Sequence, residues 1–332
     1  MRVLKRLIAL ALLCATGFSG WFAWFALSPL GFRGETLEFS IPSGVGLRQA
    51  AQLIAAAGAD FAPWQFELLG RLLRRAADIK AGSYEIAAGV TPADLLGKLT
   101  RGDVTLAEIV FVEGRTFAQM RAALAAHPEV RHDTAGLRDA DIMMRIGAGE
   151  THPEGLFFPD TYRFPKNTGD LDLLRHAYRQ MQAKLKAEWE RRDPGTPYRD
   201  PYQALILASI VEKETGLATD RAAVAAVFVN RLRRGMLLQT DPTVIYGIGA
   251  GFDGNLRRRD LAADTPYNTY TRGGLPPTPI AMPGLASLQA ALHPLASDIL
   301  YFVARGDGSS EFSRTLEEHN RAVARYQLGR GG

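Results

Sequence analysis

The strongest constraint on how this chain folds is the uncharged stretch Leu7–Phe32, 26 residues long, near its start. A helix needs about 20 apolar residues to cross the hydrocarbon core of a bilayer, so this stretch is long enough to span one. Three of the first six residues are basic, and flanking positive charge stays on the cytoplasmic side. We therefore predict a cytoplasmic tip and transmembrane anchor over residues 1–33, with the rest of the chain outside the cytoplasm.

A cleaved signal peptide is the alternative interpretation of the same stretch. Gly17-Phe18-Ser19 is a weak cleavage signal with small residues at its ends. The apolar run continues through residues 20–27, however, and adds tryptophan and phenylalanine rings suited to a membrane interface. This continuation favours an uncleaved anchor.

The remaining chain has the composition of folded, exported domains. The sequence has 332 residues, 47% of them hydrophobic, and a formal net charge of +4 with no dense basic stripe, which disfavours nucleic acid as a partner. The only cysteine, Cys14, lies in the apolar stretch, so the exported part has neither a disulfide nor a thiol nucleophile. The six histidines lack the short spacings of metal ligands, and we predict no metal site and no cofactor.

Two domains are predicted after the anchor. Residues 36–108 follow a β-α-α-β pattern. Residues 109–332 form a longer segment with more turn signals between its elements, and the two patterns together indicate an α+β protein. The expected elements are strands over 37–41, 83–87 and 109–112 and helices over 47–54, 64–73, from 91, 171–191, 205–215 and 220–234. The run 154–162, rich in aromatic residues, Pro and Gly, is typical of an ordered loop that lines or plugs a core.

The helix over 205–215 places a carboxylate on its own apolar stripe. At about 100° per residue, Glu214 falls at the centre of the face formed by Ile206, Leu207, Ile210 and Val211. Partial desolvation there raises the pKa of a carboxyl toward the range of a general acid. The alternative, left open at this point, is an ion-paired or solvated glutamate at a frayed helix end.

Other catalytic arrangements fail on specific residues. Ser209 is followed three residues later by Glu212, where a Ser-x-x-Lys acylase needs lysine, and there is no Gly-x-Ser-x-Gly elbow or phosphate-binding loop. Polar loops predicted over 239–243, 267–270 and 274–277 suit a neutral, polyhydroxylated ligand such as a sugar chain. Asp241 is the candidate for a second acid of the glycosidase type, with a turn role before Pro242 as its alternative.

Several motifs together are similar to one known family. They occur in order along the chain, as Glu113-Gly114, Phe157-Phe-Pro-Asp-Thr161, Ala208-Ser-Ile-Val-Glu-Lys-Glu-Thr215, Val227-Phe-Val-Asn-Arg-Leu232, Leu238-Gln-Thr-Asp-Pro-Thr-Val-Ile-Tyr246, Tyr267-Asn-Thr-Tyr270, Gly274-Leu-Pro-Pro277 and His293-Pro294. This set resembles the endolytic murein transglycosylase MltG (YceG-like) family. Thr278 departs from the pattern, where the family usually has glycine.

The resemblance implies an inner-membrane, single-pass protein with its N-terminus in the cytoplasm and its bulk in the periplasm. It further implies a LysM-like module at 36–108 and a YceG-like catalytic domain at 109–332 with a lysozyme-like helical core. Penicillin-binding proteins and other cell-wall synthesis enzymes are the implied protein partners.

By the same resemblance, Glu214 is the catalytic residue of a lytic transglycosylase. Such an enzyme cleaves the MurNAc-GlcNAc bond of nascent peptidoglycan strands, forms a 1,6-anhydro-MurNAc end and terminates elongation. Gln239, Asp241, Tyr267 and Asn268 are the expected substrate-binding residues. Two alternatives remain: a non-catalytic peptidoglycan-binding scaffold for cell-wall synthases, and a glycoside hydrolase that uses Glu214 with Asp241.

Overall fold

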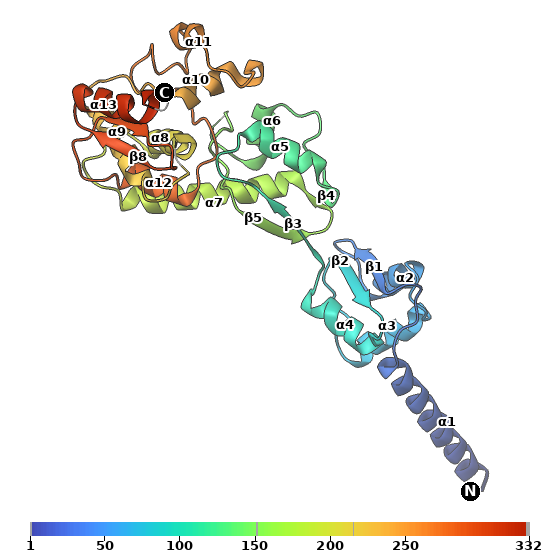
Figure 1. Cartoon of the computed structure of the whole chain (residues 1–332). Coiled ribbons are helices and arrows are strands. Elements are labelled where there is room, and N and C mark those ends of the chain that lie inside the picture. The colour runs from blue at the N-terminus through green and yellow to red at the C-terminus, as the bar shows by residue number, and fades with distance from the viewer. Residues whose placement is uncertain (1, 151, 215, 330–332) are drawn as a thin grey trace. The chain divides into compact units, whose positions relative to one another are not determined.

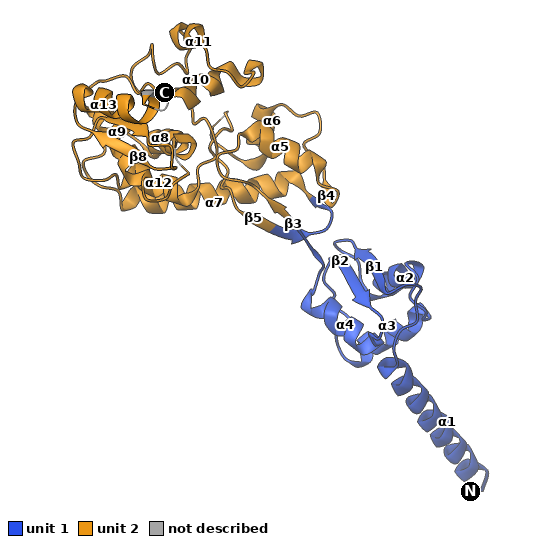
Figure 2. Cartoon of the chain, in the orientation of Figure 1, with its two compact units in different colours: residues 1–108, 163–168 blue, residues 109–162, 169–332 orange. Residues whose placement is uncertain are grey.

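The computed structural model describes residues 2–150, 152–214 and 216–329 of the chain. The chain forms two compact units (Figure 1, Figure 2). Unit 1 comprises residues 1–108 and 163–168, and unit 2 comprises residues 109–162 and 169–332. The fold is mixed α+β, as predicted.

Unit 1 begins with the apolar helix α1, Arg2–Leu27. By length and composition α1 could cross a membrane, a test that a signal sequence also passes. The side chains of residues 2–21 are exposed, whereas Phe22, Phe25 and Ala26 are buried. These three residues belong to the same hydrophobic core as the module that follows. The last turns of α1 are therefore part of the module's fold.

The module is built on a two-stranded antiparallel sheet covered by three helices. Its elements are β1 Thr36–Ile41, α2 Leu47–Ala56, α3 Pro63–Leu72, β2 Gly82–Ala87 and α4 Pro92–Arg101. Residues of β1 are alternately exposed and buried, which is the pattern of a half-buried strand. The strands pair from Thr36 opposite Ala87 to Ile41 opposite Gly82. The apolar faces of α2 and α4 complete the core.

Short strands and helices open unit 2, and the strands β3, β5 and β6 each include residues of both units. They are β3 Leu106–Val110, α5 Phe117–Ala126, β4 Val130–Arg131, α6 Asp139–Ile146, β5 Thr161–Pro165 and β6 Thr168–Gly169. Strand β3 pairs with β5, and β4 pairs with β6. The strand expected over 109–112 thus begins three residues earlier and ends at Val110, because pairing with β5 sets its bounds.

The core of unit 2 is a group of helices around α8. These helices are α7 Asp170–Glu190, α8 Pro201–Glu214, α9 Arg221–Arg233 and α12 Leu285–Leu292. Helix α8 contacts the other three, and every residue from Ala204 to Val211 is buried. A helix that is buried on all sides is fixed in position by its neighbours. The hairpin β7 Tyr301–Ala304 and β8 Ser310–Ser313 packs against α13 Leu316–Val323, which continues as a π-helical turn, Ala324–Leu328.

The polar segment between α9 and α12 contains helices that the sequence did not suggest. They are α10 Asp241–Ile248, the 3-10 turn Gly249–Gly251 and α11 Arg258–Ala262. The interpretation of residues 239–243 as a loop is therefore wrong from Asp241 onward. Pro242 lies in the first turn of α10, where a missing N–H costs no helical hydrogen bond.

Gly155 offers a test of how tightly unit 2 is packed. Its φ of +78° is left-handed, and an added Cβ would collide with the ring of Pro279. We expect Gly155→Ala to lower the free energy of unfolding by about 2 kcal/mol or more. Chemical denaturation of the detergent-solubilised chain measures this change. Gly149→Ala is the control, since an added Cβ there meets nothing within 4 Å; equal effects of the two variants would refute the packing argument.

Candidate active site

Glu214 lies at the C-terminal end of α8, where that helix leaves the core of unit 2. Its side chain is partly exposed, whereas residues 204–211 before it are buried. Glu212 serves a different contact, because its carboxylate accepts a hydrogen bond from the backbone N–H of Gly284 at 2.9 Å. The following residue, Thr215, lies outside the described residues. The fold therefore fixes Glu214 at the end of α8, where the residue is only partly exposed.

One hydroxyl group and two charges act on the ionisation of Glu214. The Thr240 hydroxyl donates a hydrogen bond to its carboxylate oxygen Oε1. Burial is the largest effect and raises the pKa of Glu214, and the nearby negative charge of Asp241 raises it further. The hydrogen bond from Thr240 and the positive charge of Arg231 lower the pKa. The net shift is upward, which favours a protonated carboxyl that can act as an acid.

Two buried threonines, Thr243 and Thr269, hold the backbone of Thr240 in place. The backbone N–H of Thr240 donates to the hydroxyl of Thr269 at 3.1 Å, and the hydroxyls of Thr243 and Thr269 are 2.9 Å apart. All three side chains are buried, and the backbone N–H of Gln239 donates to the Thr269 carbonyl at 3.1 Å. This network joins the start of α10 to residues 268–270. It thereby fixes the group that contacts Glu214.

Arg231 of α9 holds the segment that leads into α10. Its guanidinium donates to the carbonyl oxygens of Leu238 at 2.7 Å, Leu237 at 3.4 Å and Leu300 at 2.8 Å. Burial lowers the pKa of Arg231. The preceding Asn230 donates to the carbonyls of Ser297 and Ile299. The Asn-Arg pair of the sequence motif therefore fixes two loops, and Arg231 also places a positive charge near Glu214.

Gln239 and Asp241 lie on either side of Thr240 and are both exposed. Gln239 has a φ of +51°, an uncommon conformation for a residue with a side chain. The Asp241 carboxylate accepts a hydrogen bond from the Tyr270 hydroxyl at 2.5 Å. The structure thus brings Glu214, Thr240, Asp241 and Tyr270 together, with Gln239 beside them.

Tyr267 and Asn268 are held in different ways. The Asn268 side chain is fully buried and donates to the carbonyls of residues 260, 261 and 263, while its oxygen accepts from the Tyr270 N–H at 2.9 Å. Tyr267 is partly exposed; its hydroxyl is 2.9 Å from that of Thr278, and its ring meets Tyr246 edge-on with centroids 5.0 Å apart. Asn268 is thus bonded within the loop, whereas Tyr267 presents part of its surface.

Glu154 is a second acid with a raised pKa, which the sequence analysis missed. It is only 4% exposed and accepts hydrogen bonds from the Phe117 N–H and the Tyr246 hydroxyl, both at 3.0 Å. Burial raises the pKa of Glu154 to about 7. The signal in the sequence was an acid within the apolar run 154–162. Thr240, Arg231 and Tyr270 were also missed, because their roles depend on contacts between distant segments.

A partly buried carboxyl with a raised pKa, held by a fixed hydroxyl, is the arrangement of a general acid. The sequence identifies the family that uses this fold: the chain belongs to the YceG-like family, whose model matches residues 39–325. This confirms the resemblance drawn from the motifs.

Relatives with assigned names share most of the chain. The endolytic murein transglycosylase of Bacillus subtilis is 32% identical over 88% of this chain and 85% of its own length. That of Streptococcus pneumoniae strain D39 is 26% identical over 98% of this chain, which spans 65% of the pneumococcal protein. A crystal structure of a putative yceG-like protein from Listeria monocytogenes is 29% identical, with a TM-score of 0.55 over 86% of this chain and 98% of that one.

The buried acid Glu154 predicts a pH dependence of stability. In the unfolded chain this carboxyl ionises near its usual pKa of 4.5, but in the fold it does so near 7. Between these values the folded state retains a proton that the unfolded state has lost, so the free energy of unfolding falls as pH rises through this window.

We expect Glu154→Gln to remove this fall, which amounts to about 3 kcal/mol between pH 4.5 and 7. Denaturation of both proteins at a series of pH values measures the difference. Parallel stability curves for the two proteins would contradict a raised pKa at Glu154.

Proposed function

We propose that this chain is a membrane-anchored endolytic lytic transglycosylase that cleaves peptidoglycan strands in the periplasm. The observation that carries the proposal is the Glu214 carboxyl, whose pKa is raised by burial and which the Thr240 hydroxyl holds, in a member of the YceG-like family. The names of the bacillary and pneumococcal relatives support the same activity.

In the proposed reaction, Glu214 acts first as acid and then as base. Its protonated carboxyl donates to the oxygen that links C1 of MurNAc to GlcNAc, the C1–O bond breaks, and GlcNAc leaves with a hydroxyl. Positive charge develops at C1 and the adjacent ring oxygen. The Glu214 carboxylate then takes the proton of the MurNAc C6 hydroxyl, whose oxygen bonds to C1 and closes the 1,6-anhydro ring. The proton count is restored, and the attacking group is already part of the substrate.

The surrounding residues have distinct roles in this proposal. Gln239 and Tyr267 contact the sugar chain through their exposed surfaces, and Asp241 lies beside Glu214, where its charge favours the protonated acid. Asn268 acts indirectly, by holding the loop that carries Thr269 and Tyr270. We assign residues 1–33 to the inner-membrane anchor, 36–108 to a LysM-like glycan-binding module and 109–332 to a catalytic domain whose helices around α8 form a lysozyme-like core. Termination of strand growth beside penicillin-binding proteins is part of the same proposal.

A glycoside hydrolase is the second candidate, favoured by one observation. The charge of Asp241 acts on Glu214 and its carboxylate is held by Tyr270, so two acids lie at one site. In a hydrolase, Asp241 would activate water instead of the C6 hydroxyl. The two reactions differ by one water molecule in the mass of their products.

Replacement of Glu214 tests the catalytic assignment. We expect Glu214→Gln to lower the release of anhydro-ended fragments from purified glycan strands by about 10²–10⁴-fold, because acid–base catalysis is lost. Mass spectrometry of the digest measures the products. Glu212→Gln is the matched control on the same helix and should retain activity, since the amide oxygen still accepts from Gly284.

Three outcomes would contradict parts of this assignment. Full activity of Glu214→Gln would exclude Glu214 as the acid. If the unaltered chain releases products with reducing ends and Asp241→Asn abolishes their release, the hydrolase is favoured. If the unaltered chain binds glycan strands without cleaving them, both enzyme assignments are excluded and the non-catalytic scaffold is the remaining hypothesis.

The Thr240 hydroxyl should set the pH range of activity. Its hydrogen bond lowers the pKa of Glu214, so its removal raises that pKa. For an acid that must be protonated, the loss of kcat/KM on the alkaline side should therefore move to higher pH in Thr240→Val. Thr243→Val removes a hydroxyl of the same network that does not contact Glu214, so any shift of its profile should be smaller than that of Thr240→Val. A shift to lower pH in Thr240→Val would refute the assigned effect.

A further inference from the structure

Helix α1 joins the module without a linker, and this continuity limits where the module can lie. In the proposed anchor, Arg2, Lys5 and Arg6 stay at the cytoplasmic surface, and the uncharged, exposed residues 7–21 cover only about 22 Å at 1.5 Å per residue, less than the ~30 Å hydrocarbon thickness of a bilayer. From Phe22 onward the same helix contributes buried side chains to the module's core. If α1 spans the membrane, as proposed above, the module therefore begins at the bilayer surface.

The start of α3 contacts α1 close to the point where α1 enters the module's core. The ring of Trp64, in the first turn of α3, stacks on Trp21 with centroids 5.9 Å apart. Trp21, Trp24 and Trp64 are 40%, 67% and 51% exposed. Tryptophan is enriched at the boundary between lipid and water. The start of α3 thus lies at the depth where α1 leaves the hydrocarbon.

The outward face of α3 carries exposed apolar side chains near both of its ends. Trp64, Leu68 and Leu72 follow at intervals of four on one side of the helix; Trp64 and Leu72 are exposed, whereas Leu68 is partly buried and packs against the module's core. Four large apolar side chains are exposed among residues 28–108, and three of them, Trp64, Leu72 and Leu73, belong to α3 or to the residue after it. Exposed apolar residues are thus concentrated on this helix and absent from most of the module.

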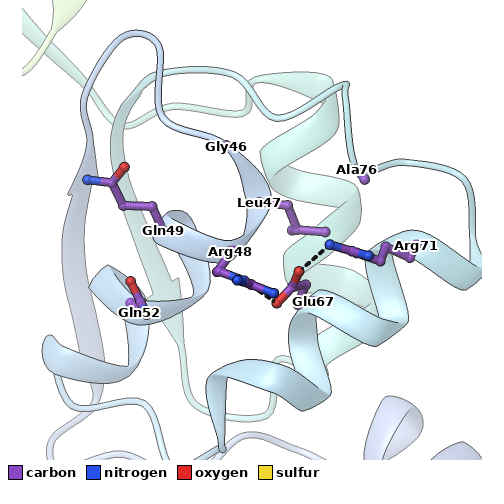
Figure 3. A pocket seen from close by; sticks show the side chains of 8 residues that line it. All are labelled: Gly46, Leu47, Arg48, Gln49, Gln52, Glu67, Arg71 and Ala76. Atoms are coloured by element: carbon purple, nitrogen blue, oxygen red, sulfur yellow. Dashed lines mark hydrogen bonds and ion pairs between the residues drawn. The ribbon is translucent and has the colours of Figure 1, made fainter.

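The charges at this end of α3 suit an anionic surface. Arg71, Arg74 and Arg75 are all exposed. Figure 3 shows the side of α3 that lines a pocket, where Glu67, the only acid of the helix, lies between Arg48 and Arg71 at 3.0 Å and 2.5 Å. Glu67 is therefore neutralised by these contacts, and the end of the helix is positive.

Arg74 has a left-handed backbone where a glycine is usual. Its φ is +56°, and the N–H of Arg75 donates to the carbonyl of Gly70 at 2.8 Å, as in a Schellman helix end. A residue with a side chain is strained in this conformation. Strain of this kind is a reason to propose a function for the exposed arginine side chain.

We propose that α3 lies on the outer surface of the phospholipid bilayer, with Trp64 and Leu72 in the interface and the arginines 71, 74 and 75 against lipid phosphates. This inference rests on the proposed anchoring by α1. It makes the module a second membrane contact, in which an amphipathic helix lies in the plane of the interface. Contact at two points would fix the module's orientation, which a single helix leaves free to rotate.

A depth measurement on the full chain tests this proposal. With Cys14→Ser as background, an environment-sensitive fluorophore is attached at Leu72→Cys or at Ser43→Cys. Ser43 is an exposed turn residue at the Ile41–Gly82 end of the two-stranded sheet, whereas α1 leads into the opposite end through the bond from Leu30 N–H to Val90 carbonyl. The protein is reconstituted in vesicles of phosphatidylethanolamine and phosphatidylglycerol with a spin label at a shallow acyl position.

We expect blue-shifted emission and strong quenching for the label at position 72, and neither for the label at position 43. Equal, weak quenching at both sites in protein that floats with the vesicles would overturn the proposal and leave the anchor intact. Protein that fails to float would instead refute anchoring. Blue-shifted emission at position 72 without quenching by the lipid label would indicate that another protein surface, such as a second copy of the chain, covers α3.

Arg74→Gly separates the lipid contact from stability. Glycine relieves the backbone strain, so the variant should fold at least as stably as the unaltered chain. Loss of the charge should nevertheless reduce quenching of the label at position 72 in vesicles that contain phosphatidylglycerol. Unchanged quenching would refute the role of Arg74 at the lipid surface.

Discussion

The candidate site depends on the contact between the end of α8 and the start of α10. Burial of residues 204–211 fixes α8 against the other core helices, so the Glu214 carboxyl emerges at a defined point. The Thr240 hydroxyl meets it there, and the threonine network and the Arg231 guanidinium fix Thr240 in turn. An acid that is positioned in this way needs little reorganisation when charge develops next to it.

The electrostatics of this contact are balanced between opposing effects. Burial and the charge of Asp241 favour the protonated form of Glu214, whereas Thr240 and Arg231 favour the ionised form. A residue that donates a proton and then takes one back needs both forms to be accessible. Glu154 differs, because it is almost completely buried and its hydrogen bonds join the start of α5 to α10. Its role in the structure is to connect segments, and a raised pKa alone would not distinguish the two acids.

The sequence predicted those features that depend on local periodicity. The 3.6-residue repeat placed α7, α8 and α9 and selected Glu214 over Glu212, and the structure gives Glu212 a separate partner at Gly284. The helix that begins at Asp241 was missed, because Asp-Pro is common in turns and also suits a helix start. The burial of Asn268 was not visible either, since a Tyr-Asn pair among turn residues has the same sequence whether its amide is buried or exposed. Contacts between distant segments, such as that of Thr240 with Glu214, have no local signal.

Two residues with a strained, left-handed backbone lie at the positions for which we propose binding roles, one in each unit. Arg74, Asn167 and Gln239 have positive φ among the described residues other than glycine. Asparagine adopts this conformation readily, whereas for arginine and glutamine it costs roughly 1 kcal/mol relative to glycine. Both of these side chains are exposed, so neither is retained for packing. Gln239 adjoins the residue that holds Glu214, and Arg74 ends the helix that stacks on the anchor. A strained backbone with an exposed polar side chain is explained when that side chain binds a partner outside the protein; we propose a sugar strand as the partner of Gln239 and a lipid phosphate as that of Arg74.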